Sequence, residues 1–258
     1  NISNDWTCNI KIKIMFGKKI FFKKKVLIYG LGLSGKSCLK FLKKNNTITI
    51  FDDFKTHNNN KSFCYNVNTV KNKKFDFIVL SPGIDIKNCK LSKYLKKNQK
   101  KIITELDIFY LMFPKNLKIT ITGTNGKSTS CQIIYEILKS KNLDVRLVGN
   151  IGKPPLLEKK IKPKTIFIIE ASSYQISYSK YFKTDYAAIL NLSPDHLERH
   201  GNINKYAMAK LKLIYNQDKK AYSYIEKYNS IINKNILKES IKSKLYKINY
   251  NKIKFFKN

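Results

Sequence analysis

The chain has 258 residues, 43% of them hydrophobic, which is enough apolar material for two globular domains and excludes an intrinsically disordered chain. Its formal net charge of +34 would suit a nucleic-acid partner, yet only Arg146 and Arg199 are arginines among 51 basic residues, and lysines recur in every segment. This uniform bias toward Lys, Asn and Ile disfavours a dedicated nucleic-acid-binding face, and no apolar run approaches the ~18 residues of a membrane span.

The first 24 residues are predicted to be a basic extension outside the folded domains. Lysine alternates with apolar residues there too often for the core of a signal peptide. The chain begins at Asn1 and contains Met15, so we expect that the sequence is a fragment or that translation starts at a different residue. Five scattered cysteines without a C-x-x-C pair indicate a reducing, cytoplasmic environment and no structural zinc: Cys8, Cys38, Cys64, Cys89 and Cys131.

A strand–turn–helix unit is predicted near the start of a first domain, which we place at residues 25–113. Residues 26–29 are an apolar strand, a G-x-G-x-x-G turn spans residues 30–35, and a helix extends to about residue 44. Such a turn places backbone N–H groups and a helix N-terminus around a diphosphate.

An acidic pair ends the next predicted strand, residues 48–51. Asp52 and Asp53 follow the first glycine by about 20 residues, the spacing at which a carboxylate binds a ribose hydroxyl in dinucleotide-binding folds. Three interpretations remain open: an NAD site, a site for another diphosphate, and glycines that serve only close helix–strand packing.

The rest of the first domain continues the alternation of strands and helices. Residues 75–80 are predicted to form a buried strand that ends in Ser81-Pro82-Gly83. A hydroxyl and backbone donors would then lie at the carboxyl edge of a parallel sheet, unless the segment is a plain turn. A helix, a strand, a helix and a Pro-containing domain boundary follow at residues 91–99, 101–104, 105–112 and Pro114.

The stretch from Ile119 to Thr129, ITITGTNGKST, is the strongest motif and lies in a second domain at residues 114–258. A strand runs into a turn with two glycines and a helix begins after it, so backbone N–H groups converge on an anion. Lys127 can reach terminal phosphate oxygens, and the Ser128 hydroxyl can bind a Mg2+ ion that bridges them. The motif predicts an ATP site formed by Gly123, Thr124, Asn125, Gly126, Lys127, Ser128, Thr129 and Ser130.

Further apolar, β-prone segments separated by helical or loop sequence predict a mostly parallel sheet with helices on both faces. These strands are expected at residues 117–122, 145–148, 165–169 and 186–190. In the helix after the central motif, Ile133, Ile134, Ile137 and Leu138 fall at helical spacing, so we expect that face to pack on the sheet.

Polar residues follow the strands of the second domain, as expected for a site at the carboxyl edge of a sheet. Glu170 is placed like the acidic metal ligand of a nucleotide-binding sheet, with an exposed strand-end carboxylate as the alternative. His196 and His200 are four residues apart, but Pro194 and Gly201 bracket them. A long helix is therefore not expected there, and His200 is expected at the surface.

A lysine lies on the apolar face of the predicted helix at residues 203–215. Ile203, Tyr206, Ala207 and Ile214 share that face, and Lys210 lies within it. A buried lysine requires a partner or a changed charge state. Because lysine is so frequent in this chain, its chance placement on this face remains the alternative.

Four segments in this order resemble the motifs of the Mur ligases of peptidoglycan synthesis. The resemblance extends from about Val26 to Tyr215, and it is greatest to the members that add D-glutamate to UDP-N-acetylmuramoyl-L-alanine. The segments are TGTNGKST at residues 122–129, GNIG at 149–152, EASSYQ at 170–175, and NLSPDHLERHG through YAMAK at 191–210.

The resemblance implies an ATP-dependent amide ligase that forms an acyl phosphate on the L-alanine carboxylate, which the amine of D-glutamate then attacks. The implied fold is α/β, with a Rossmann-like UDP-binding domain followed by a P-loop-type ATP-binding domain that has a mostly parallel sheet. The C-terminal ligase domain of the family is expected to be absent. The implied cofactors are ATP and Mg2+, and the protein would be a cytoplasmic monomer.

The resemblance also assigns roles to residues and makes a UDP-sugar diphosphate the expected ligand of the glycine-rich turn, in place of NAD. Catalytic roles fall on Lys127, His196 and Lys210, the last as a carbamate that turns a cation into an oxygen ligand. The implied metal ligands are Ser128, Glu170, His196 and Lys210. The implied contacts to the UDP precursor are Leu33, Ser34, Asp52, Ser81, Asn150, Ser172 and Gln175.

Beyond Tyr215 the sequence departs from the family pattern. It has AYSYIEKYN where members usually have a strand that ends in an Asn-x-Asp-Asp turn. We therefore expect the ATP-binding domain to lack its last strands, and the 258-residue chain alone to have no ligase turnover. Two alternatives remain: a non-catalytic remnant or fragment that binds the UDP precursor or ATP, and another ligase of the superfamily such as folylpolyglutamate synthase.

Overall fold

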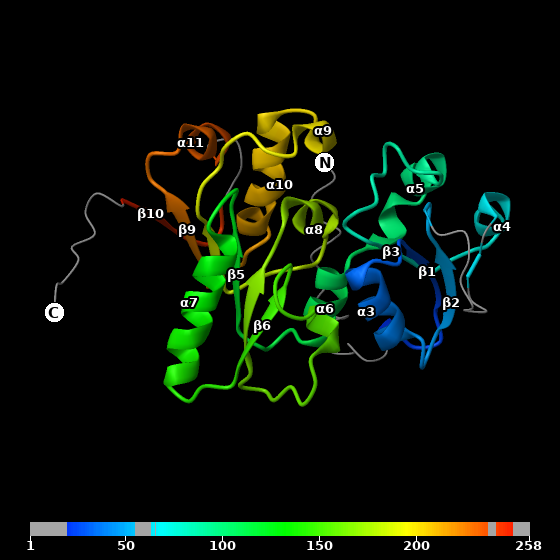
Figure 1. Ribbon diagram of the computed structural model, residues 1–258, viewed down its shortest axis with the longest axis horizontal. Coiled ribbons are helices and arrows are strands. Elements are labelled where there is room, and N and C mark those ends of the chain that lie inside the picture. The colour runs from blue at the N-terminus through cyan, green and yellow to red at the C-terminus, as the bar shows by residue number, and fades with distance from the viewer. Residues whose placement is uncertain (1–19, 55–62, 65, 237–240, 250–258) are drawn as a thin grey trace. The chain divides into compact units, whose positions relative to one another are not determined.

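The computed structural model describes residues 20–54, 63–64, 66–236 and 241–249, and the chain divides into two compact units (Figure 1). Among these residues, unit 1 comprises 20–54, 63–64, 66–115, 154–157 and 178–182, and unit 2 comprises 116–153, 158–177, 183–236 and 241–249. Two short segments from the second half of the sequence therefore belong to unit 1.

Unit 1 is built on four parallel strands, β1 (Lys25–Tyr29), β2 (Thr47–Phe51), β3 (Phe77–Leu80) and β4 (Ile102–Ile103), in the spatial order β2-β1-β3-β4. In the central strand β1, the run Val-Leu-Ile-Tyr is buried throughout, which is typical of a parallel strand covered on both faces. Tyr29 pairs with both Phe51 and Leu80, so the carboxyl ends of these three strands lie level. The turns that follow them therefore share one edge of the sheet.

Helical segments alternate with these strands. They are α3 (Leu33–Leu42), α4 (Val67–Lys71), α5 (Ser92–Lys97), the 3-10 helix η1 (Gln99–Lys101) and α6 (Glu105–Met112). A capping box formed by Thr104 and Asp107 begins α6. The 3-10 helix η2 (Pro155–Leu157), one of the two segments from the second half of the sequence, packs against α3 and α6.

The buried carboxylate of Asp107 holds the other segment, residues 178–182, to unit 1. Its Oδ1 accepts hydrogen bonds from the backbone N–H groups of Lys180, Tyr181 and Phe182 at 2.8, 2.7 and 3.0 Å. The same oxygen accepts from Ser179 Oγ at 2.7 Å. Since a buried carboxylate needs this many donors in place of water, the segment and the carboxylate stabilise each other.

Unit 2 contains six parallel strands: β5 (Lys118–Thr122), β6 (Val145–Gly149), β7 (Ile166–Glu170), β8 (Tyr186–Ile189), β9 (Tyr222–Glu226) and β10 (Lys244–Ile248). Their spatial order is β10-β9-β8-β5-β7-β6, and every pairing in it is parallel. The predicted α/β class with mostly parallel sheets is confirmed. β5, the strand before the central motif, lies in the interior of this sheet, between β7 and β8.

The helices of unit 2 within the described residues are α7 (Lys127–Ser140), α8 (Ser173–Tyr178), α9 (Leu197–His200), α10 (Ile203–Tyr215) and α11 (Ser230–Ile236). α7 packs on β5, β6 and β7, and α10 packs on β8 and α11 (Figure 1). None of the helices in the described part of the chain has the length and apolar character needed to cross a membrane.

One sequence-based expectation about unit 2 is wrong. Ile133 and Ile137 do not pack on the sheet, because their side chains are 53% and 55% exposed, and α7 packs instead through Cys131, Ile134 and Leu138. The sheet also extends beyond β8 through β9 and β10. In β9 the burial alternates along YSYIE, which is the pattern of a strand with one face on the core.

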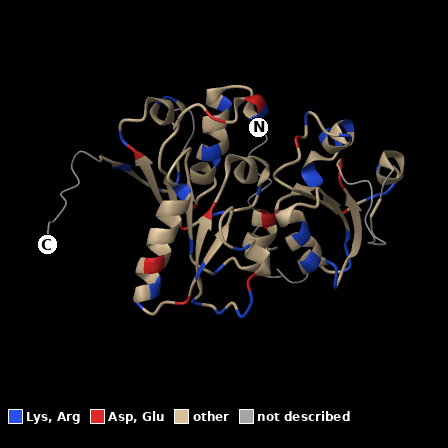
Figure 2. Cartoon of the chain, in the orientation of Figure 1, with Lys and Arg blue, Asp and Glu red and all other residues tan. Residues whose placement is uncertain are grey.

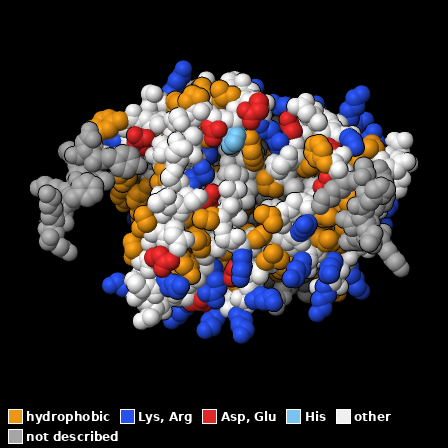
Figure 3. Space-filling model, viewed as in Figure 1, with side chains coloured by type: hydrophobic (Ala, Val, Ile, Leu, Met, Phe, Trp, Pro, Cys, Tyr) orange, Lys and Arg blue, Asp and Glu red, His pale blue; other side chains and the backbone are white. Residues whose placement is uncertain are grey.

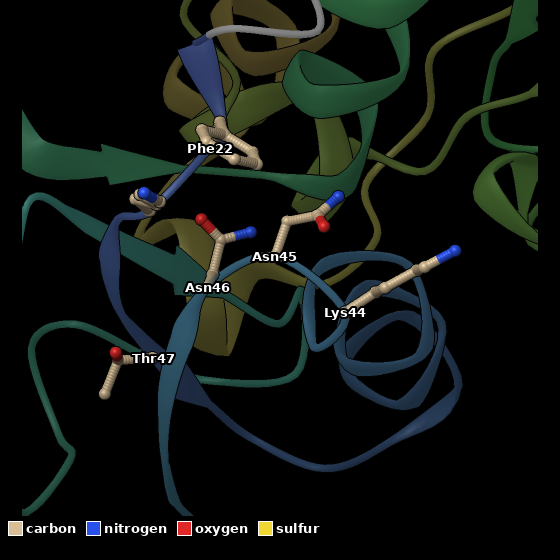
Figure 4. Close-up of a pocket in the computed structure, with 6 residues that line it drawn as sticks. Phe22, Lys44, Asn45, Asn46 and Thr47 are labelled. Atoms are coloured by element: carbon tan, nitrogen blue, oxygen red, sulfur yellow. The ribbon is translucent and has the colours of Figure 1, made fainter.

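Charge is spread widely over the molecule. Figure 2 shows lysine and arginine on helices, strands and loops of both units, and Figure 3 shows their side chains on the surface. A cavity of about 410 Å³ lies at the amino ends of β1 and β2 (Figure 4), the edge of the sheet opposite the glycine-rich turn. It is lined by Phe22, Lys23, Lys44, Asn45, Asn46 and Thr47.

Candidate functional site

The loop between β5 and α7 has the backbone conformation that its glycines permit. Gly123 has φ 156° and Gly126 has φ 78°, and Gly126 is the N-cap of α7 without a side-chain capping bond. The first N–H groups of this 14-residue helix are therefore not capped by a side chain of its N-cap residue. This is the local structure that binds anions at a helix N-terminus.

Asn191, which follows β8, braces this loop from the neighbouring strand. Its Oδ1 accepts from Asn125 N at 2.9 Å, its Nδ2 donates to Asn125 O at 3.2 Å, and its backbone carbonyl accepts from Thr124 N at 3.0 Å. Asn191 was not among the residues predicted to have a role of their own. The available signal was an amide residue at the end of the strand that pairs with β5.

Lys127 lies over the loop that it follows. Its Nζ donates to Thr124 O at 2.8 Å, and the side chain is half-buried. The ammonium is thus held on the same side as the uncapped N-terminus of α7, where both would act on the same anion.

Ser128 and Glu170 are in direct contact. Ser128 Oγ donates to Glu170 Oε2 at 2.6 Å, and Asn150 Nδ2 donates to Glu170 Oε1 at 2.9 Å. Glu170 is at the end of β7, paired with Ile121 of β5, and its side chain is buried. The parallel register therefore brings three separate sequence motifs together at one carboxylate.

Gly149 makes this approach possible. Its φ is 111°, and a Cβ at this position would lie 2.2 Å from Glu170 O. A side chain at residue 149 would therefore separate the two strands where Glu170 enters the site.

The chemistry of these donors fits a Mg2+ ion. A hydroxyl and a carboxylate are the hard oxygen ligands that Mg2+ takes from proteins, with phosphate oxygens and water supplying the rest. Among the described residues, no three His, Cys, Asp or Glu side chains cluster as a complete protein-only metal site.

Lys210 is buried, as the helical spacing predicted. Its Nζ donates to Gly123 O at 2.8 Å and Thr122 Oγ1 at 3.3 Å, and it lies 4.8 Å from the ring centroid of Tyr206. Burial, and then the charge of Lys127, lower the pKa of Lys210 to about 7. A substantial fraction of this amine is therefore neutral near pH 7.

Tyr206 connects Lys210 to the loop, and the sequence analysis assigned it only to the apolar face of α10. Its hydroxyl lies 3.1 Å from Thr124 Oγ1. Because residues 206 and 210 are one helical turn apart, the same ring lies beside the Lys210 ammonium.

His196 and His200 have different surroundings in the structure. His196 has φ 53° and precedes the short α9, with its Nε2 3.4 Å from Asp195 Oδ2. His200 is partly buried: its ring stacks on Tyr174, and its Nε2 lies 3.0 Å from Ser173 Oγ. Burial, and then nearby positive charges, lower the pKa of His200.

Ser172 and Gln175 are engaged with each other. Gln175 Oε1 accepts from Ser172 N at 2.9 Å and Ser172 Oγ at 3.2 Å, and Gln175 N donates to Ser172 Oγ at 3.3 Å. This reciprocal arrangement is a capping box at the start of α8. Both residues, which the resemblance assigned to the substrate, therefore also fix the start of this helix.

In unit 1, the glycine-rich turn also requires glycine at particular positions, where a side chain would be strained or would clash. Gly30 has φ 90°, and a Cβ on Gly35 would lie 1.9 Å from Gly30 O. Ser81 is buried and donates from its hydroxyl to Gly30 O at 2.6 Å. Ser81 therefore holds the turn, while Leu33, at the start of α3, is 79% exposed on its surface.

The two acidic residues after β2 also brace this edge of the sheet. Asp52 accepts from Leu31 N at 2.7 Å and Phe54 N at 3.0 Å, and Asp53 accepts from the Tyr29 hydroxyl at 2.6 Å. Asp52, which the resemblance assigned to the UDP precursor, thus contributes to the shape of the turn through its carboxylate.

Comparison with known proteins matches both units. The profile of the Mur ligase middle domain family matches residues 121–258, and that of the Mur ligase MurD-like N-terminal domain matches residues 24–103. Among curated relatives, UDP-N-acetylmuramoylalanine–D-glutamate ligase of Caldicellulosiruptor saccharolyticus is 35% identical, covering 81% of this chain and 49% of the relative. The ligase of the same name from Elusimicrobium minutum is 38% identical, covering 90% and 54%. The chain thus spans about half the length of these relatives.

Solved structures match the fold. The ligase of Neisseria meningitides that joins UDP-N-acetylmuramate to L-alanyl-gamma-D-glutamyl-meso-diaminopimelate superposes with a TM-score of 0.56 at 13% identity, covering 87% of this chain and 78% of that one. A murein peptide ligase from Psychrobacter arcticus gives a TM-score of 0.51 at 13% identity, covering 87% and 53%. At this identity the likeness concerns the fold alone.

Proposed function

The chain belongs to the Mur ligase family, and we propose that it carries the two nucleotide-binding units of a ligase that adds D-glutamate to UDP-N-acetylmuramoyl-L-alanine. Residues 25–113 would bind the UDP precursor and residues 114–258 would bind ATP. The observation that carries the proposal is the contact of Ser128 with Glu170 beside the loop between β5 and α7. The names of the curated relatives support the choice of D-glutamate as the added amino acid.

The ATP phosphates would bind on the loop of residues 123–130. Lys127 would exchange its hydrogen bond to Thr124 O for one to the terminal phosphate, because an anionic oxygen is the stronger acceptor. Ser128 and Glu170 would hold Mg2+, which when bound neutralises charge on the phosphates.

The proposed reaction has two steps. The L-alanine carboxylate of the UDP precursor attacks the γ-phosphorus, the bond to the β–γ bridging oxygen breaks, and ADP leaves. The amine of D-glutamate then attacks the acyl phosphate, and the tetrahedral intermediate expels phosphate while the amine loses a proton. Lys127 contributes by stabilising the negative charge on the transferred phosphoryl group.

Lys210 would act as its carbamate. The neutral amine, favoured by the lowered pKa, attacks carbon dioxide, a C–N bond forms, and the nitrogen releases a proton to solvent. The product is an oxygen anion on the apolar face of α10, which together with His196 would complete a second cation site. Asn150, Ser172 and Gln175 would lie toward the muramoyl end of the substrate.

In unit 1 the diphosphate would lie on the turn from Gly30 to Gly35, near Leu33 and Ser34. Asp52 would face the uracil side, and Ser81 would keep the turn in shape through Gly30 O. We propose that the protein acts as a monomer in the cytoplasm. The free thiols of the four cysteines within the described residues suit that compartment.

Isothermal titration calorimetry tests the proposal. We expect the purified chain to bind UDP-N-acetylmuramoyl-L-alanine, and to bind a non-hydrolysable ATP analogue in a Mg2+-dependent manner. Binding of the analogue without the UDP precursor would favour a folylpolyglutamate-type ligase, and binding of neither would favour a remnant. Phosphate release with and without D-glutamate tests the further expectation that this chain alone does not turn over.

A further inference from the structure

A buried carboxyl group lies directly behind the glycine-rich turn of unit 1. Glu105, the first residue of α6, is 5% exposed, and its Oε1 accepts a hydrogen bond from Ser37 Oγ at 2.6 Å. The hydroxyl of Ser34 and the backbone of Leu156 also face this carboxyl group, and both lower its pKa. Ser34 and Ser37 are one helical turn apart on α3, so Glu105 holds the inner side of that helix where it begins.

Glu105 supplies an acidic group to the first two turns of α3 from a different helix. The N-cap of α3, Gly32, has no side-chain capping bond, and the first turn of α3 carries no acidic residue. A ligand diphosphate in front of the turn would meet the positive end of the helix, while Glu105 lies behind the same turn. A carboxylate at that point would repel the diphosphate, whereas a neutral carboxylic acid would not.

We propose that Glu105 is a positioning residue of the diphosphate turn, which holds Ser34 and Ser37 from behind and takes up one proton from solvent when the diphosphate binds. The inference rests on the proposed function, since it takes the UDP precursor as the ligand of unit 1. It adds a residue that neither the sequence motif nor the resemblance singled out.

The groups around Glu105 agree with this role. From α3 it faces Ser34, Ser37 and the buried thiol of Cys38, whose pKa is raised by burial and by Glu105 itself. From η2 it faces the backbone of Leu156, and its neighbour on α6, Asp107, is directed to residues 179–182. The influences on its pKa are burial, which raises it, and these hydrogen bonds, which lower it less. A ligand dianion would raise this pKa further.

This rise in the pKa of Glu105 sets the direction in which diphosphate affinity changes with pH. A group whose pKa rises on binding takes up protons, so affinity for the diphosphate should increase as the pH falls. Uptake of one proton per ligand limits the effect to about tenfold in affinity per pH unit. A purely structural brace would give no such dependence.

The test is calorimetry of UDP-N-acetylmuramoyl-L-alanine binding to the whole chain, in paired buffers of different ionisation enthalpy, from pH 5.5 to 8. Glu105→Gln keeps the size and a hydrogen-bonding carbonyl but cannot be protonated. The matched control is Asp76→Asn, which removes one negative charge at the amino edge of the same sheet, where Asp76 accepts from Lys25 N. His57→Gln removes the histidine that occurs in residues 1–115, because histidine is the residue type whose ordinary pKa lies in this range.

We expect the wild-type chain, Asp76→Asn and His57→Gln to take up protons on binding and to bind more tightly at lower pH. Glu105→Gln should take up none and should bind at pH 8 at least as tightly as the wild-type chain. Binding without proton uptake in the wild-type chain, or unchanged uptake in Glu105→Gln, would overturn this inference alone. Absence of any binding by the wild-type chain would overturn the proposed function and this inference with it. If circular dichroism shows that Glu105→Gln does not fold, proton uptake by the wild-type and His57→Gln chains still tests the inference.

Discussion

Ser128 Oγ and Glu170 Oε2 are 2.6 Å apart, although 42 positions separate the two residues in sequence. The contact arises because β5 and β7 are adjacent parallel strands whose carboxyl ends lie level. It joins the first residues of α7 to the carboxylate that would share a Mg2+ ion with ATP.

Glu170→Gln should weaken Mg2+-dependent nucleotide binding by tenfold or more, corresponding to about 1.4 kcal/mol, since an amide is a poorer Mg2+ ligand than a carboxylate. Titration of a fluorescent ADP analogue with and without EDTA measures the effect. Glu136→Gln is the matched control, because Glu136 lies on the exposed side of α7 and bonds only Gln132 among the side chains of that helix. Equal losses in both variants would argue against a metal role for Glu170.

Lys210 should make the protein more stable as the pH rises from about 7 toward the pKa of an ordinary lysine. In that window the unfolded chain binds the proton that the folded chain has lost, so the free energy of unfolding gains up to about 1.4 kcal/mol per pH unit. Lys118, whose pKa burial lowers to about 8, acts in the same direction. Urea unfolding at pH 7 and 9 measures the slope.

Lys210→Met should remove the contribution of Lys210 to the pH dependence of the free energy of unfolding. It should not reduce stability at pH 7, because an apolar side chain of similar length has no charge to desolvate. Lys139→Met, at an exposed position of α7, controls for the loss of one positive charge from a very basic chain. If the free energy of unfolding depends on pH equally in Lys210→Met and Lys139→Met, the pH dependence does not come from Lys210.

Gly35→Ala should destabilise unit 1 by about 1–3 kcal/mol, because the new Cβ would lie 1.9 Å from Gly30 O. Gly32→Ala is the matched control three residues earlier, since a Cβ there meets nothing within 4 Å and its φ is −73°. Thermal unfolding of the two variants should separate them clearly. Similar melting temperatures of the two variants would mean that the backbone of the turn follows a different path from the one in the structure.

Asp107→Asn should destabilise unit 1 by about 1–3 kcal/mol or more, because the amide nitrogen cannot accept the hydrogen bonds that now converge on the carboxylate. Limited proteolysis should show faster cleavage near residues 178–182. Asp85→Asn changes an exposed local contact and should leave the cleavage rate as it is.

Much of the fold was predictable because parallel strands in covered sheets are continuous apolar runs. The predicted strand at residues 186–190 and helix at residues 203–215 correspond closely to β8 and α10. The exposed side of α7 was not predictable, since Ile133 and Ile134 both fit a helical stripe and only the angle at which the helix meets the sheet decides between them.

The candidate site residues also include some that the sequence predicts and one that it does not. Motif spacing identified Lys127, Ser128 and Glu170 as candidate site residues, because an ammonium, a hydroxyl and a carboxylate each have a distinct role in binding phosphate or Mg2+. Glu105 escaped notice because its role depends on a contact with Ser37, 68 positions away, and on burial by η2. Such long-range packing is specified by the whole fold and leaves no local signal.

The interior place of β5 in its sheet has a consequence for synthesis on the ribosome. Thr120 pairs with Ile169 on one side and with Ala187 on the other, so neither neighbour of this strand exists when the strand is made. The loop between β5 and α7 therefore cannot take its final form until the chain has been extended through residue 189 and that region has emerged. Until then the apolar strand remains open to wrong partners, which makes this interval the period when a nascent chain most needs a chaperone.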